Sequence, residues 1–165
     1  GIAWIRTNRS EGPKDRKRIQ EEVIPVEMEL QQENEKKKEY FKSYRKAVRR
    51  EQDILEEIQR LRLDKMFPAM VNDGMPKGSH QSDLSDYAVL LDEQIEILKK
   101  ERLEKVRLYS EIEFKIRQME NEDEQRVLRL RYIKGLKWEE VAVEMGYSWR
   151  RIHDIHGKAL RNFEL

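Results

Sequence analysis

Apolar residues recur at three- and four-residue steps along most of the chain, which is the pattern of amphipathic helices. The first such run extends from Glu35 to Met66 and contains neither Gly nor Pro. A second run begins at Ser82 or Ser85, either of which can cap a helix, and continues to Glu120. Each run has one narrow apolar seam close to a heptad repeat. Two helices of similar length joined by one loop predict an antiparallel, coiled-coil-like hairpin.

The seam of the second helix is interrupted in its middle. Arg102 and Lys105 break a rhythm that is otherwise apolar. The residues expected to face the first helix are Leu84, Ala88, Leu91, Ile95 and Leu98 before the break, and Val106, Tyr109, Ile112, Ile116 and Met119 after it. Because a two-helix hairpin buries only one stripe on each helix, its other apolar residues need a second hairpin, and a homodimer is expected.

The end of the chain has shorter helical runs separated by glycines. Asp123–Ile133 and Trp138–Met145 each have one apolar face, and Gly135 follows the first run. Gly146 ends the second run, and Ser148 can cap a third helix directly after Tyr147. Two short helices joined by such a turn predict a helix-turn-helix, whose final helix enters the major groove of double-stranded DNA.

The final helix divides into an apolar stripe and a basic side. Ile152, Ile155, Ala159 and Phe163 form the stripe, with Leu160 beside it. The candidate DNA-binding residues are Trp149, Arg150, Arg151, His153, Asp154, Lys158 and Arg161. Arg150 and Arg151 can donate bidentate hydrogen bonds to guanine edges or to phosphates. Lys158 and Arg161, further along, are expected to meet phosphates.

Four further positions carry specific expectations. Trp138 is expected in the core, and His156 is expected to form a hydrogen bond within the domain. Gly157 lies inside a helix, where it costs about 1 kcal/mol relative to Ala, so a neighbour or DNA is expected to approach closely there. Lys137 precedes the second short helix and cannot accept backbone hydrogen bonds, so a weak cap is expected.

The segment RYIKGLKWEEVAVEMGYSWRRIHDIHGKAL resembles region 4 of bacterial sigma factors. It resembles more closely the phage-encoded regulators related to the RinA and ArpU late-gene transcription activators. The residues that carry the resemblance are Trp138, Glu139, Glu140, Val141, Ala142, Gly146, Tyr147, Ser148, His156, Gly157, Lys158, Ala159 and Leu160. By position, the resemblance implies groove contacts at Trp149, Arg150, Arg151, His153 and Asp154.

The sequence also departs from sigma region 4. Arg150 stands where the family usually has an acidic residue, and Trp149 where it has a basic or polar one. Asp154 replaces a residue that is commonly Gln, and Lys137 replaces a capping Thr or Ser. These differences predict a DNA site other than the standard promoter element.

The charge composition bears on both the fold and the expected affinity for DNA. Charged residues make up 41% of the 165-residue chain and hydrophobic ones 38%, which favours extended helices with narrow seams over one compact globule. The formal net charge is only +1. The excess of basic charge is local, because Ser148 to Arg161 contains four Arg and Lys residues against Asp154 alone. A near-neutral total predicts modest affinity for a single copy. It predicts a second contact, through a homodimer or through host RNA polymerase.

Other chemistry finds little support in the sequence. There is no Gly-rich phosphate loop and no HExxH motif, and the chain contains no Cys. His80, His153 and His156 do not form a convincing metal set. No enzyme activity, catalytic residue, cofactor or metal is therefore expected. No apolar run approaches the length of a membrane span, and the cytoplasm of a bacterial host is the expected location.

These patterns predict an all-α protein in three parts. Residues 1–34 are expected to form an N-terminal arm, partly disordered or docked on a partner. Residues 35–120 are expected to form the hairpin that dimerises, and residues 121–165 the helix-turn-helix domain. The expected function is sequence-specific transcriptional regulation of phage or prophage type. A DNA-binding packaging protein like a small terminase subunit and a helical protein-interaction module remain the alternatives.

Overall fold

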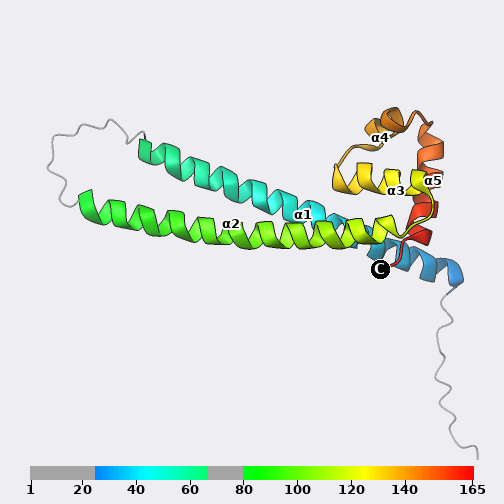
Figure 1. Cartoon of the computed structure of the whole chain (residues 1–165), viewed down its shortest axis with the longest axis horizontal. Coiled ribbons are helices and arrows are strands. Elements are labelled where there is room, and N and C mark those ends of the chain that lie inside the picture. The colour runs from blue at the N-terminus through cyan, green and yellow to red at the C-terminus, as the bar shows by residue number, and fades with distance from the viewer. Residues whose placement is uncertain (1–24, 67–79) are drawn as a thin grey trace, which may run out of the picture.

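The computed structural model describes residues 25–66 and 80–165, and all elements in these ranges are helical (Figure 1). The expected all-α class is therefore confirmed. Residues 1–24, which hold most of the expected arm, and residues 67–79 of the hairpin loop lie outside the described residues.

Two long helices, α1 (Val26–Met66) and α2 (His80–Arg117), lie side by side in antiparallel orientation (Figure 1). Helix α1 begins directly after Pro25, whose carbonyl accepts hydrogen bonds from the backbone N–H groups of Met28 and Glu29. Residues 26–34, assigned to the arm from the sequence, therefore belong to the helix. Helix α2 begins before the serines expected to cap it and ends three residues short of the expected boundary at 120.

The apolar contact between α1 and α2 is strongest near the end where the C-terminal helices lie. Ile58 and Leu98 are buried in the distal half of the pair. The buried hydrophobic residues toward the other end are Phe41, Ala47, Leu108, Ile112 and Ile116. Four predicted seam residues are wrong, since Leu84, Ala88, Val106 and Tyr109 are exposed. Beyond the break, Leu108 is buried instead.

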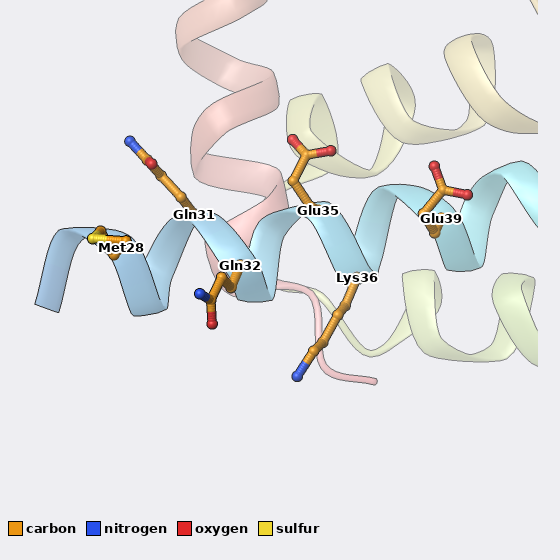
Figure 2. A pocket seen from close by; sticks show the side chains of 6 residues that line it. All are labelled: Met28, Gln31, Gln32, Glu35, Lys36 and Glu39. Atoms are coloured by element: carbon orange, nitrogen blue, oxygen red, sulfur yellow. The ribbon is translucent and has the colours of Figure 1, made fainter. Parts of the chain in front are cut away.

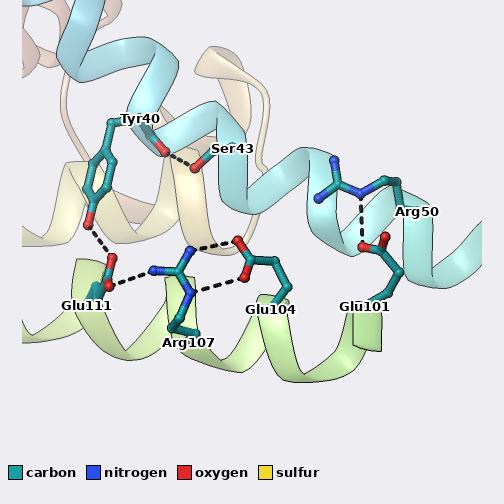
Figure 3. A network of polar contacts seen from close by, with 7 residues as sticks. All are labelled: Tyr40, Ser43, Arg50, Glu101, Glu104, Arg107 and Glu111. Atoms are coloured by element: carbon teal, nitrogen blue, oxygen red, sulfur yellow. Dashed lines mark hydrogen bonds and ion pairs between the residues drawn. The ribbon is translucent and has the colours of Figure 1, made fainter. Parts of the chain in front are cut away.

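Charged residues join the two helices where the seam is interrupted. Glu51 of α1 pairs with Lys105 at 2.7 Å and with Arg102 at 3.8 Å. Nearby, the Arg50 guanidinium pairs with Glu101 at 2.9 Å (Figure 3). The polar break is thus matched by acidic and basic partners on the facing helix, and the apolar face of α2 resumes with a shifted phase.

The C-terminal helices follow at one end of the long pair (Figure 1). Helix α3 (Glu122–Leu128) continues into a π-helical turn, η1 (Arg129–Ile133), and is followed by α4 (Trp138–Met145) and α5 (Trp149–Asn162). Gly135 and Gly146 have positive φ angles of 74° and 67°, which explains why glycine follows each short helix. The predicted succession of helices and turns is confirmed.

One hydrophobic core joins the long helices to the C-terminal ones. Phe41 of α1 is fully buried, with its ring 4.7 Å from that of Tyr132 and 4.5 Å from that of Phe163. The buried residues of this cluster are Phe41, Ile112, Ile116, Met119, Leu128, Tyr132, Ala159, Leu160 and Phe163. A second cluster of Val127, Leu130, Val141 and Ile152 lies between α3, η1, α4 and α5. Helix α5 is consequently held from two sides.

Two basic residues of α1 anchor the C-terminal helices. The Lys37 ammonium is buried and donates to the carbonyl of Leu160 at 2.8 Å, where the negative end of the α5 dipole lies. Arg45 donates to the carbonyl of Ile133 at 3.1 Å. A Cβ on Gly135 would lie 2.5 Å from the Arg45 guanidinium carbon, so this turn fits closely against α1.

A surface hollow follows the first turns of α1 (Figure 2). Its lining residues are Met28, Gln31, Gln32, Glu35, Lys36 and Glu39, all from this one helix. The side chains point in different directions and do not converge on one point (Figure 2). The hollow therefore offers no built binding site.

Candidate nucleic-acid interface

The turn between α4 and α5 is defined by local hydrogen bonds. Gly146 adopts the left-handed conformation, and the N–H of Tyr147 donates to the carbonyl of Ala142 at 3.2 Å. The Ser148 hydroxyl accepts from the N–H of Arg151 at 3.2 Å, which confirms the predicted cap. These contacts fix the direction in which α5 leaves the turn.

The start of α4 is capped in an incomplete way. The Lys137 side chain makes no capping bond, as its chemistry requires. The Glu140 carboxylate instead reaches back and accepts the N–H of Lys137 at 2.7 Å. This is the reciprocal half of a capping box, and it compensates in part for the missing Ser or Thr.

Helix α5 has one buried face and one exposed face. Ile152, His156, Ala159 and Leu160 are buried, while Ile155 is half-buried. The exposed charged residues of the helix are Arg150, Arg151, Asp154, Lys158 and Arg161. The predicted basic face is thus available to an external partner and is not covered by the hairpin.

Arg150 and Asp154 lie one helical turn apart on this face. Within the described ranges, neither side chain takes part in a hydrogen bond or an ion pair. Charged groups of opposite sign at this spacing often pair on a helix. Here both retain their full hydrogen-bonding capacity for another molecule.

Arg151 has a different environment from its neighbour. Its guanidinium carbon lies 4.2 Å from the centre of the Tyr147 ring. The Tyr147 hydroxyl donates to the Asp123 carboxylate of α3 at 2.8 Å, and this hydrogen bond raises the pKa of Tyr147. Arg151 is therefore attached to the turn and to α3 through one aromatic ring.

The aromatic residues near the start of α5 form a connected group. The His153 ring centre lies 4.7 Å from that of Trp138 and 3.9 Å from that of Trp149. Arg131 lies over the Trp138 ring at 4.7 Å. Trp138 is partly buried against the second core cluster, whereas Trp149 is 58% exposed. His153, predicted to point outward with Arg150, instead packs between the two tryptophans.

His156 forms the expected hydrogen bond within the domain. Its Nε2 lies 2.8 Å from the Tyr132 hydroxyl, in a buried position. Burial lowers the pKa of His156 to about 4 and raises that of Tyr132 to about 12. At neutral pH the tyrosine is protonated and the imidazole is neutral, so the hydrogen bond joins two uncharged groups.

Gly157 does not contact a close neighbour in the described chain. A Cβ built at this position would meet nothing within 4 Å. No residue that the structure describes therefore makes the expected close approach to Gly157.

Two acidic residues of α3, Asp123 and Glu124, contact the turn and α5, and these contacts were not predicted from the sequence. Glu124 is buried and accepts from the Asn162 amide at 2.9 Å, while Asp123 holds Tyr147. Neither contact has a local sequence signal, because the partners are far apart along the chain. The tyrosine that follows Gly146 was the one available sign that the turn carries an aromatic ring.

The geometry defines a helix-turn-helix with an exposed cationic recognition helix, which is a DNA-binding class of fold. A family model described as "Sigma-70, region 4" matches residues 121–163. Residues 121–163 thus form a helix-turn-helix of the sigma-70 region 4 type, and region 4 of sigma-70 is a DNA-binding domain. Comparison with curated proteins and with solved structures gives no match. No helix in residues 25–66 or 80–165 is long and apolar enough to cross a membrane.

Proposed function

We propose that this chain is a sequence-specific transcriptional regulator of phage or prophage type that binds double-stranded DNA through α5. The observation that carries the proposal is the exposed basic face of α5 on a helix fixed by two core clusters. A rigid recognition helix loses little conformational entropy on binding, which favours a specific complex. The match to a sigma-70 region 4 model supports DNA as the partner.

Arg150 and Asp154, the two charged residues of α5 that form no ion pair among the described residues, are proposed to contact base edges. Arg150 has the donor geometry for guanine O6 and N7, and the Asp154 carboxylate can accept from cytosine N4. The four residues from Arg150 to Asp154 advance the helix by about 6 Å, which is close to the rise of two base pairs, about 6.8 Å. Arg150 and Asp154 would therefore read base pairs about two steps apart, and the site would contain guanine and cytosine.

The remaining candidates have supporting contacts in this proposal. Lys158 and Arg161 neutralise phosphates, which gives affinity without sequence information. The exposed face of Trp149 contacts a sugar or a thymine methyl group. His153 holds Trp149 in place from behind through its ring.

A second contact is proposed because the net charge of +1 gives one copy little general attraction for DNA. Apolar residues of α2 remain exposed along its length, namely Val89, Ile97, Leu103, Val106 and Phe114. By contrast, α1 exposes no large hydrophobic residue between positions 31 and 62. We assign the exposed apolar residues of α2 to a homodimer contact. Host RNA polymerase, in the bacterial cytoplasm, is proposed as a further partner of the complex between the protein and DNA. No catalytic step or cofactor is part of this proposal.

The test is selection of genomic fragments by the purified full chain, followed by transcription from the recovered fragments with host RNA polymerase. The proposal expects fragments that share a short motif next to a promoter, and a changed transcript level when the protein is added. Motifs at a packaging start site without any effect on transcription would favour the terminase-like alternative. Failure to retain any duplex at low salt would favour a protein-interaction module.

A further inference from the structure

Asp123, Tyr147 and Arg151 form a chain of contacts across three elements. Asp123 belongs to α3, Tyr147 to the turn, and Arg151 to the first turn of α5. The carboxylate accepts the tyrosine hydroxyl at 2.8 Å, and the ring lies 4.2 Å from the guanidinium carbon. The two contacts connect the exposed Arg151 guanidinium to the turn and to α3.

From this arrangement we infer that Tyr147 is a positioning residue for DNA binding. Its ring, oriented by Asp123, holds the Arg151 guanidinium at the edge of the recognition helix to contact a DNA phosphate. The inference rests on the proposed function, since it assumes that α5 binds DNA. It also gives the two adjacent arginines different roles, since Arg150 contacts a base and Arg151 contacts the DNA backbone.

The chemistry of the guanidinium supports this role. An aromatic ring contacts the flat face of the group, while the N–H donors point outward in its plane. The Arg151 guanidinium lies over the Tyr147 ring and makes no ion pair with a carboxylate of the described residues, so it retains donors for the two oxygens of a phosphate. An arginine already held in place loses less rotamer entropy when that contact forms.

The Tyr147 hydroxyl is suited to remain a donor in this chain of contacts. The hydrogen bond to Asp123 and the charge of that carboxylate both raise the pKa of Tyr147. The ring is thereby held at both ends, by Asp123 at its hydroxyl and by the turn at its backbone. No carboxylate of α3 forms an ion pair with Arg151 in the described structure, so the guanidinium is not neutralised there.

The experiment is a double-mutant cycle on the full chain with a short random-sequence DNA duplex, which does not require the target site. Tyr147→Leu should weaken binding roughly two- to five-fold, the range of an exposed cation–π contact. In an Arg151→Ala background the same substitution should have no effect. Tyr147→Phe retains the ring and should recover part of the loss.

Lys158→Ala provides the matched control, because Lys158 is an exposed cation of the same helix without an aromatic neighbour among the described residues. In that background Tyr147→Leu should retain its full effect. Arg151→Ala should also lower the slope of log affinity against log salt by about 0.9, as expected for one lost phosphate contact. Thermal unfolding of each variant identifies losses caused by misfolding, and Tyr147→Phe then serves as the milder probe.

Two outcomes would overturn the inference while leaving DNA binding intact. Equal losses with and without Arg151 would give Tyr147 a purely structural role. Tighter binding by Tyr147→Leu would mean that the ring holds Arg151 away from DNA. A wild-type chain that binds no duplex even at low salt would reject the proposed function itself, and the inference with it.

Discussion

At the scale of single residues, Arg150 and Arg151 are adjacent in the sequence and have different surroundings. Arg151 lies against the Tyr147 ring, whereas the Arg150 side chain makes no hydrogen bond or ion pair within the described residues. The sequence predicted that both would be exposed, because helical periodicity places them outside the apolar stripe. It could not separate them, because the Asp123–Tyr147 contact depends on how α3 packs against the turn.

The two histidines of α5 show the same limit. A hydrogen bond of His156 within the domain was predicted from the sequence. Its partner, the Tyr132 hydroxyl, was not predicted. His153 was grouped with the outward residues, but aromatic packing turns its ring toward Trp138 and Trp149. Helical periodicity predicts which side of α5 a residue lies on. It does not predict which neighbours the ring of a residue such as His153, at the edge of the apolar stripe, will contact.

His156 makes a specific contribution to the pH dependence of stability. Its pKa is about 4 in the folded protein and 6.5 when unperturbed, so the unfolded chain binds the proton more tightly. The stabilisation is therefore fully present above pH 6.5 and decreases as the pH falls toward 4. Between pH 7 and pH 5 the free energy of unfolding should fall by about 2 kcal/mol from this group.

Urea unfolding of the wild type and of His156→Gln at both pH values measures this contribution. The carboxylates titrate in both proteins, so the difference between their pH dependences isolates the histidine. The same pH dependence in both proteins would show that His156 is not buried in its neutral form.

Gly157→Ala tests the reason for a glycine inside α5. A Cβ meets nothing within 4 Å, so the substitution should raise the free energy of unfolding by about 1 kcal/mol through helix propensity. If DNA passes close to this position, the variant should also bind DNA more weakly although it is more stable. Denaturant titration and a binding isotherm give the two quantities.

Gly135→Ala is the matched control for that substitution. Its φ angle is +74°, and the new Cβ would collide with the Arg45 side chain, so this variant should lose stability. A destabilised Gly157→Ala variant would contradict the open environment of Gly157.

At the scale of elements, α1 has a second role beside the hairpin. The sequence predicted a helix with a narrow seam, and the helix is present with an earlier start at Val26. Its early turns also supply Lys37, Phe41 and Arg45 to the C-terminal helices. No local pattern distinguishes these contacts from ordinary seam positions, because they join residues about 90 to 120 positions apart.

Phe41→Ala should therefore destabilise the DNA-binding domain as well as the hairpin. The ring is fully buried between Tyr132 and Phe163, and its loss should cost about 3–5 kcal/mol. The chain has a third tryptophan, Trp4, so urea unfolding is followed in a Trp4→Phe background, where the fluorescence of Trp138 and Trp149 reports directly on the helix-turn-helix. DNA affinity should fall together with the population of folded α5.

Phe114→Ala is the matched control, since Phe114 of α2 is 65% exposed. It should change the free energy of unfolding little. Comparable losses from both substitutions, or a helix-turn-helix signal unchanged in Phe41→Ala, would contradict a shared core.

At the scale of the whole molecule, the helix-turn-helix lies at one end of a long helical pair (Figure 1). The hairpin topology followed from the sequence, because two long periodic runs separated by one Gly- and Pro-containing segment have few other arrangements. The phase of α2 beyond Arg102 did not follow, since it depends on how Glu51 pairs with Arg102 and Lys105.

The proposed dimer contact makes a measurable prediction. Leu103→Glu combined with Val106→Glu places carboxylates within the exposed apolar stripe of α2 and should convert a dimer to a monomer. Sedimentation velocity over a range of concentrations gives the assembly state. Arg49→Glu with Gln59→Glu on the exposed side of α1 should leave it unchanged. A wild-type protein that sediments as a monomer at all concentrations would contradict a homodimer.

Methylation interference at a recovered site shows whether α5 enters the major groove with Arg150 at a guanine edge. Methylation of guanine N7 blocks the acceptor that Arg150 would use in that groove. One such methylation should prevent binding by the wild type and have no further effect on Arg150→Ala, whose specific binding is already weaker by about 1–3 kcal/mol. Interference confined to adenine N3 in the minor groove, or an identical guanine pattern for both proteins, would contradict it.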